Sequence, residues 1–161
     1  MVASRTADAL QARFGAAVQD VVVFRSEVTA VVDRDSIAYI CTFCRDELDY
    51  RYLSDISAVD WLDRRPRFDV VYHLVCVSDW SRFRLKVQVD EDEPVPTVTP
   101  VWSGANWPER EVWDLFGIVF DPHPQLERLL MPDGWLGHPL RKDYAQTRIT
   151  LPRPKDEKVL E

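Results

Sequence analysis

The sequence contains little of what several classes of protein need. Its 161 residues include three cysteines and five glycines, and the formal net charge is -7. A cysteine-poor chain is not a small disulfide scaffold, and an acidic chain lacks the basic surface that nucleic acid requires. No apolar run is long enough to span a bilayer, and the first residues show no signal-peptide pattern. We therefore predict a cytoplasmic protein that meets a membrane only through its partners.

Common catalytic and nucleotide-binding motifs are also missing. There is no G-x-G-x-x-G, P-loop or H-E-x-x-H pattern, and no nucleophile placed beside a base. One metal-like pattern, C-x2-C…H-x2-C, is formed by Cys41, Cys44, His73 and Cys76. The first two share a face of an expected helix, whereas His73 and Cys76 point to opposite faces of an expected strand. We interpret the cysteines as reduced, buried thiols rather than as zinc ligands.

What the sequence does contain is a succession of helical and strand patterns. Amphipathic periodicity predicts helices over residues 4–14 and 35–48, and Asp35 or Ser36 can cap the second. The order α-β-β-α-β-β-β predicts an α+β fold, a two-layer domain with helices packed on a mixed or antiparallel sheet. Arg25-Ser26 is the expected hairpin turn, and the strands are expected at residues 20–24, 27–33, 52–61, 68–77 and 81–89.

The later strands differ in pattern. Residues 52–61 alternate without a cleanly apolar face, so their register stays open, while residues 68–77 form the apolar run of a central strand. Residues 81–89 alternate strictly, with apolar side chains inward and a polar outer row. We interpret this row as a solvated face or as edge protection, with a docking surface for an acidic partner as the alternative. It consists of Arg82, Arg84, Lys86 and Gln88.

An acidic, proline-containing loop at residues 90–97 ends the expected sheet. We divide the chain into an α+β domain (1–100), an interface region with a short helix and irregular segments (101–144), and an extended C-terminal arm (145–161).

The short helix is expected from Asn106 to about Phe116. Asn106 is a suitable N-cap, and Glu109, three residues later, completes a capping box. Gly117 suits the end of the helix, and Arg110 can pair with Asp114 one turn further on. This helix is apolar on more than one side, which indicates that it is buried or that it binds another protein.

The irregular stretch that follows contains carboxylates and two histidines, so catalysis must be considered. His123 and His138 are each followed by proline and lie fifteen residues apart, with no helical spacing to fix them together. Tryptophan, tyrosine and arginine on a proline-restrained backbone are more typical of a protein–protein interface.

The same stretch resembles a known family. It reads E-R-E-V-W-D-L-F-G at 109–117, H-P at 123–124, and L-M-P-D-G-W-L-G-H-P-L-R-K-D-Y at 130–144. This combination is similar to the hallmark region of the C subunit of respiratory complex I, the proton-pumping NADH:quinone oxidoreductase. The strand containing Val70-Val71-Tyr72-His73-Leu74 and the order of elements agree with it. Gly134 and Ala145 depart from the family, which usually has an acidic residue and a proline there.

The resemblance implies a non-catalytic scaffold in the peripheral arm, on the cytoplasmic side of the inner membrane. Such a scaffold packs against the D subunit and its neighbours and carries no cofactor. FMN, iron–sulfur clusters and quinone are bound by the other subunits. We expect Arg141, Lys142 and Asp143 to form charge-paired contacts to a neighbour. The expected interface consists of Glu109, Arg110, Glu111, Trp113, Asp114, Phe116, His123, Trp135, His138, Arg141, Lys142, Asp143 and Tyr144.

Two alternatives stay open. Related subunits occur in ferredoxin-linked photosynthetic complexes and in membrane-bound hydrogenases, where a chain of this family would look much the same. A different class is a free-standing metal-dependent enzyme that uses His123, His138 and nearby carboxylates.

Overall fold

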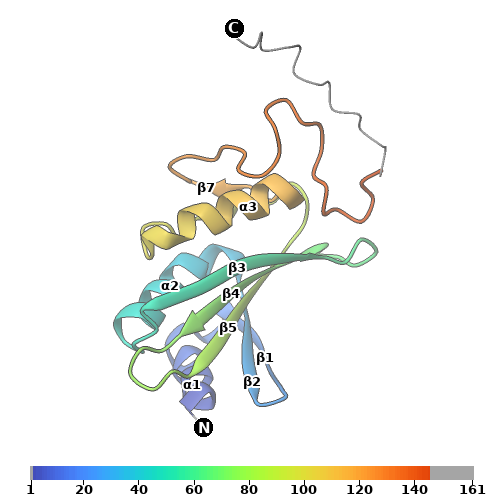
Figure 1. Cartoon of the computed structure of the whole chain (residues 1–161). Coiled ribbons are helices and arrows are strands. Elements are labelled where there is room, and N and C mark those ends of the chain that lie inside the picture. Colours follow the sequence, from blue (N-terminus) through green and yellow to red (C-terminus); the bar gives the residue numbers. More distant parts are fainter. Residues whose placement is uncertain (1, 146–161) are drawn as a thin grey trace, which may run out of the picture.

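The computed structural model describes residues 2–145, so the predicted arm at 145–161 lies outside the described residues except for Ala145. Within these residues the main regular elements are a five-stranded sheet and three α-helices (Figure 1). The helices are α1 (Val2–Phe14), α2 (Ile37–Asp46) and α3 (Asn106–Phe116). The strands of the sheet are β1 (Val18–Phe24), β2 (Glu27–Val32), β3 (Tyr52–Asp60), β4 (Phe68–Val75) and β5 (Arg82–Val89).

The sheet is mixed, with strand order β1-β2-β5-β4-β3. β2 and β5 are parallel neighbours, and the other pairs are antiparallel. The predicted α+β class and element order are therefore confirmed. β5 lies in the centre of the sheet, so its outer polar row is not edge protection, and that interpretation is wrong.

The helices and the inner face of the sheet share one hydrophobic core. Leu10 of α1 and Ile40 of α2 are fully buried in it, together with Phe68, Tyr72 and Leu85 of the sheet. Val112 of α3 belongs to the same core, and α3 packs along the edge strand β3. Two short strands, β6 (Val95–Pro96) and β7 (Phe120–Asp121), pair in parallel across the predicted boundary at residue 100. The predicted boundaries at 100 and 144 remain predictions.

The register of β3 is set by a β-bulge that simple alternation does not anticipate. The pairing of β3 with β4 shifts between Leu53 and Asp55. Leu53 therefore packs against the core together with Ile56, although an uninterrupted two-residue period would put them on opposite faces.

Three short 3₁₀ turns join these elements: η1 (Gly15–Ala17), η2 (Arg34–Ser36) and η3 (Ser103–Ala105). Ser36 occupies the expected N-cap position of α2, which starts at Ile37, but its hydroxyl donates to Asp33 and makes no hydrogen bond to the helix. The β1–β2 hairpin is confirmed, and Arg25 and Ser26 have φ values of 49° and 68°. Two successive positive φ values are typical of the tight turns that suit the twist of a hairpin.

The cysteines occupy the positions expected for buried thiols. Cys41 and Cys44 lie in the core, whereas His73 faces an open groove on the other side of the sheet. Burial raises the pKa of the Cys44 thiol to about 12 and raises that of Cys41 well above its usual range. A thiolate ligand is thus disfavoured where these residues lie.

Candidate protein–protein interface

After α3 the chain turns back over the helix and reaches the end of the sheet. Figure 1 shows this path, in orange and red, above α3 and beyond the far end of β3. The reversal begins at Gly117, whose φ of 79° is left-handed. A Cβ atom there would lie 2.6 Å from the His138 ring and 2.7 Å from Arg141. Glycine is thus required both for the turn and for the close approach of the returning chain.

Three buried side chains hold α3 and the returning chain in place, and we call them anchors. The first is Glu109 of α3, which points into the protein. Its side chain is fully buried, and its carboxylate accepts hydrogen bonds from Val98 N–H (2.7 Å) and the Thr97 hydroxyl (2.5 Å). The predicted capping box is wrong, because Asn106 is the first helical residue and Glu109 bonds to Thr97 and Val98, which directly follow β6. Burial raises the pKa of Glu109 to about 7, although these two bonds oppose the shift.

His123 covers the same carboxylate. Its Nε2 lies 3.7 Å from Glu109 Oε2 and 3.3 Å from Asn106 O, and both side chains are buried. The N–H of Gln125 donates to Nδ1 at 3.0 Å, so the remaining proton of a neutral ring is on Nε2, facing the helix. Burial lowers the pKa of His123, which keeps the ring neutral.

The second anchor is Asp114, near the end of α3. Its Oδ2 accepts three backbone hydrogen bonds at 2.8–3.0 Å, from Leu129, Leu130 and Met131. Its Oδ1 accepts a hydrogen bond from Arg128 at 2.5 Å. Burial alone would raise the pKa of Asp114, but the three N–H groups and Arg128 outweigh it and lower that pKa. The expected pairing of Asp114 with Arg110 is wrong, because Arg110 donates to Glu127 O.

Arg128 extends this anchor along the returning chain. Its guanidinium donates to Trp135 O at 2.8 Å and lies over the Trp113 ring, 5.7 Å from the centroid. His138 Nδ1 is 2.9 Å from Asp114 O. One buried carboxylate and one arginine thus hold residues 128–138 against the helix.

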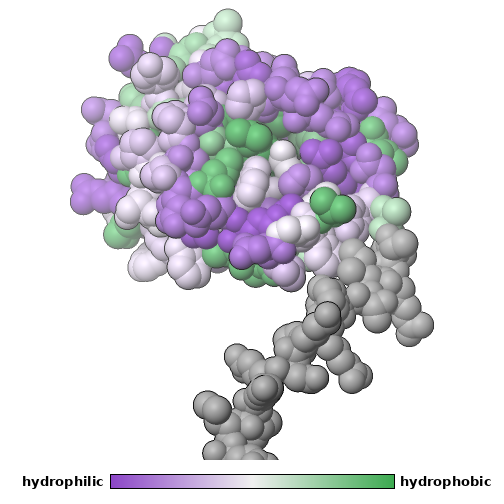
Figure 2. All heavy atoms as spheres, turned by 90° about the horizontal axis from the view of Figure 1, so that it is seen from above, coloured by the Kyte–Doolittle hydropathy of each residue, from purple (hydrophilic) through white to green (hydrophobic). Residues whose placement is uncertain are grey.

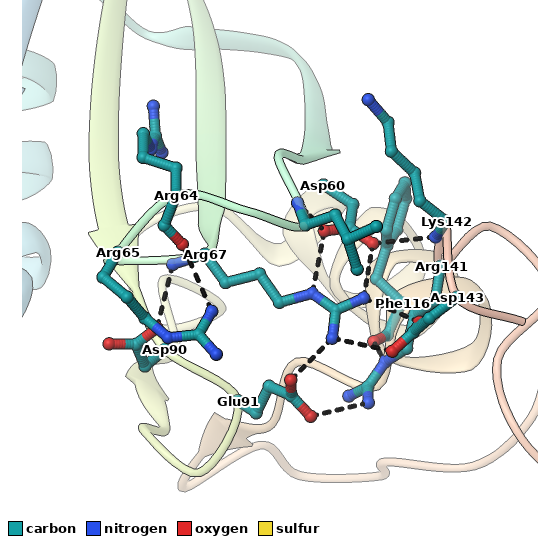
Figure 3. Close-up of polar contacts among 11 residues, drawn as sticks. Asp60, Arg64, Arg65, Arg67, Asp90, Glu91, Phe116, Arg141, Lys142 and Asp143 are labelled. Carbon is teal, nitrogen blue, oxygen red and sulfur yellow. Dashed lines mark hydrogen bonds and ion pairs between the residues drawn. The ribbon is translucent and has the colours of Figure 1, made fainter.

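The third anchor is Arg67, between β3 and β4 (Figure 3). Its guanidinium donates two hydrogen bonds to Asp60, at 2.8 and 2.7 Å, and two to Asp143, at 3.0 and 2.7 Å. A further bond reaches Glu91 at 2.6 Å. The arginine is buried, and its contact lowers the pKa of Asp60 and of Asp143. These carboxylates raise the pKa of Arg67 in turn.

Residues 141–144, Arg-Lys-Asp-Tyr, complete the third anchor from the returning chain (Figure 3). Arg141 donates to Phe116 O at 2.5 Å and to Glu91 at 3.2 Å, and the N–H of Lys142 donates to Asp60 at 2.8 Å. Arg141 and Asp143 thus already have partners within the chain. The Tyr144 hydroxyl donates to Leu136 O at 3.3 Å. That Arg141, Lys142 and Asp143 pair with a neighbouring protein stays a prediction.

The surface that these anchors support is partly apolar. Leu136 is 85% exposed, Leu130 58% and Leu140 51%, and Trp107 on α3 is 66% exposed. Figure 2 shows the molecule from above, and hydrophobic side chains lie among hydrophilic ones near the middle of that face. Glu111 and Lys142 are exposed, whereas the expected interface residues Trp113, Phe116, Trp135 and His138 are partly buried. Sequence reasoning did not find Asp60, Arg67, Glu91 and Arg128, each of which has at least one partner 14 to 82 positions away.

The two histidines considered for catalysis lie at different places. His123 is held at the start of α3 by Asn106 and Gln125, and His138 at its end by Asp114. Within residues 2–145 no three His, Cys, Asp or Glu side chains are grouped as metal ligands would be. No described helix combines the length and apolar character needed to cross a bilayer.

The geometry defines a small α+β protein whose returning chain forms a folded surface. The fold is shared with a chain in the structure of the membrane-bound sulfane sulfur reductase, an archaeal respiratory membrane complex. The TM-score is 0.75 at 22% identity, covering 97% of this chain and 98% of the other.

Sequence comparison identifies the family. Residues 30–150 match the model of the family described as "Respiratory-chain NADH dehydrogenase, 30 Kd subunit", and the chain belongs to this family. The C subunit of the NADH-quinone oxidoreductase of Geobacter metallireducens is 50% identical over 137 residues, which cover 84% of this chain and 85% of that protein. The C subunit of the Geotalea uraniireducens enzyme is 46% identical over 136 residues, 84% of this chain and 83% of the relative. The predicted resemblance to the C subunit of complex I is confirmed.

Proposed function

We propose that this chain is a cofactor-free scaffold of NADH-quinone oxidoreductase that docks on the D subunit through the returning segment, residues 117–145, and the exposed side of α3. The assembly lies on the cytoplasmic side of the inner membrane, and FMN, iron–sulfur clusters and quinone are held by its other subunits. The names of the relatives support the assembly, and the geometry of the segment supports the docking role.

The observation that carries the docking role is the exposure of leucines on a firmly held backbone. Leu130, Leu136 and Leu140 are more than half exposed, yet their neighbours Met131, His138 and Arg141 are tied to α3 or its end by hydrogen bonds. An apolar surface whose backbone is already fixed loses little entropy on association. Exposed apolar side chains beside polar ones are characteristic of protein interfaces.

The charged hallmark residues have a supporting role in this proposal. Glu109 and Asp114 are fully buried and accept hydrogen bonds from donors of the same chain. They shape the segment and do not meet a partner directly. Exposed charges such as Glu111 and Lys142 lie where they can form the polar rim of the contact.

The docking role is tested with Leu136→Asp in the complete chain, expressed in its host. We expect the D subunit to be recovered with the purified variant at about one tenth of the wild-type level or less. Circular dichroism and the thermal midpoint should stay unchanged, because Leu136 is 85% exposed. The matched control is Tyr39→Asp on α2, which is 73% exposed and away from the segment. Normal recovery of the D subunit with Leu136→Asp would refute the proposed surface.

A further inference from the structure

One edge of the sheet is covered by a helix and the other is not. α3 packs along β3, but β1 stands at the other end of the strand order. Within residues 2–145, β1 pairs with β2 alone, so its outer side has no strand beside it. The β1–β2 hairpin projects at the bottom of Figure 1, to the right of α1.

Protection of this edge is confined to its beginning, where a bulge and Asp20 lie. Val22 is 45% exposed, Val23 62% and Phe24 64%. The register of β1 shifts between Val18 and Asp20, but the run from Asp20 to Phe24 pairs regularly and contains no lysine or proline. Natural sheets protect an edge with such residues or with bulges along it, so an unprotected apolar edge indicates a missing strand.

The backbone of the edge specifies what can cover it. Phe24 and Val22 pair with Glu27 and Thr29 across the hairpin. In an antiparallel ladder alternate residues bond to the neighbour, so the N–H and C=O groups of Val21 and Val23 point away from β2. The Val21 N–H already donates to Asp20 Oδ1 at 2.8 Å, which leaves the N–H of Val23 and the two C=O groups for an added strand. An extended backbone laid alongside would pair with these outward-facing groups as the next strand of the sheet.

A charged residue lies at each end of the edge, and the two have opposite signs. Asp20 lies at the start of the regular run and accepts one bond, from its neighbour Val21 N–H at 2.8 Å. Arg25 follows the run and lies over the Phe24 ring, 5.2 Å from the centroid. Neither forms an ion pair with another described residue. A strand added here would therefore meet one negative end, an apolar middle and one positive end.

We propose that β1 is a second docking site, at which an extended segment of another protein of the same assembly adds a sixth strand to the sheet. The segment has apolar side chains in its middle, a basic residue that meets Asp20 and an acidic residue that meets Arg25. The site lies outside the returning segment at 117–145 and does not depend on the proposed contact with the D subunit.

The first test places a photo-crosslinking amino acid at Val23 of the complete chain in its assembled complex. We expect crosslinks to an extended peptide of another protein in the purified complex, with the charge pattern given above. The same probe at Tyr39, which is 73% exposed on α2, should not crosslink to that peptide. Crosslinks to a second copy of this chain, or to no other protein of the complex, would overturn the proposal.

The second test changes the edge and measures how much of the chain stays in the purified complex. Val23→Lys places a charge on the edge, and we expect retention at least about tenfold below wild type, with Tyr39→Lys unaffected. The double variant D20R/R25E reverses the charge pattern, and it should also reduce retention. Because both positions are exposed, this swap tests the site even if Val23→Lys fails to fold. Wild-type retention of the swap and of folded Val23→Lys would show that β1 meets no strand.

Discussion

Arg67 and Asp143 lie 76 positions apart and share two hydrogen bonds, at 3.0 and 2.7 Å. The arginine side chain is 3% exposed, whereas the aspartate is 50% exposed. Asp60 occupies the other side of the same guanidinium and is itself 1% exposed. The pair thus fastens the end of the returning segment to a charge that the sheet already buries.

Arg67→Ala should destabilise the protein strongly. It leaves the buried Asp60 carboxylate without its cation, and breaking a buried pair in this way costs about 3–5 kcal/mol. Asp143→Asn should cost about 1 kcal/mol at most, because its carboxylate is half exposed. Denaturant unfolding measures both changes. Arg65→Ala is the control, since Arg65 is 65% exposed and 3.6 Å from Asp90, and an equal loss in all three variants would contradict the assignment.

The stability of the protein should carry a pH dependence that comes from Glu109. Its pKa is raised from 4.5 to about 7, so the folded state binds more protons than the unfolded state between these values. The stability that Glu109 contributes is fully present below pH 4.5 and is lost as the pH rises to about 7. The loss in the free energy of unfolding is about 3 kcal/mol. Glu109→Gln should therefore match wild type near pH 5 and exceed it near pH 8.

Unfolding free energies of wild type and Glu109→Gln across this range measure the effect. The amide can still accept from Val98 N–H and donate to Thr97, whose hydroxyl can turn to Thr99 at 2.9 Å. Asp60 and Asp114 have lowered pKa values, so their contribution to stability rises with pH. They do so in both proteins, and subtracting one unfolding free energy from the other cancels that contribution. A difference that does not change between pH 5 and 8 would exclude a raised pKa at Glu109.

Asp114→Asn should loosen the returning segment while the sheet stays folded. An amide cannot accept from three backbone N–H groups and Arg128 together, and each donor left unsatisfied costs about 1–3 kcal/mol. We expect faster hydrogen exchange at Leu129, Leu130 and Met131, with unchanged protection in β4 and β5. Glu111→Gln, on the exposed side of the same helix, should leave these amides protected.

Gly117→Ala should displace the returning segment by two effects. The φ of 79° disfavours any side chain, which costs about 1–2 kcal/mol. The new Cβ would also collide with His138 and Arg141, at 2.6 and 2.7 Å. Gly104→Ala is the matched control, because nothing lies within 4 Å of its Cβ position. Equal thermal midpoints of the two variants would argue against the close packing described at Gly117.

The regular part of the fold could be predicted because its signals are local. The strict alternation of residues 81–89 becomes the buried row Phe83, Leu85, Val87 and Val89 of β5. Sheet order was less accessible, since the sequence does not show that β2 and β5 are parallel neighbours. The register of β3 depends on one bulge, which leaves no mark in composition.

The anchors of the returning segment could be predicted only in part. Glu109, Asp114 and Asp143 are recognisable in the sequence, but sequence reasoning assigns each a partner close by in the chain or in another protein. Their actual partners are Thr97, Arg128 and Arg67, which lie 12, 14 and 76 positions away. From sequence alone, a capping box and a helical ion pair are the simplest partners for Glu109 and Asp114. In the folded protein both side chains are buried and bond to distant residues instead.

The position of Arg67 also sets an order of events during protein synthesis. All five strands of the sheet are complete at Val89, so the sheet can form while later residues are still being added. Asp143 emerges 76 residues after Arg67, at about 5–20 residues per second. Until then Asp60 and Glu91 are the carboxylates that pair with the arginine. The returning segment is therefore the last part of residues 2–145 to reach its place, after the sheet that holds Arg67 is complete.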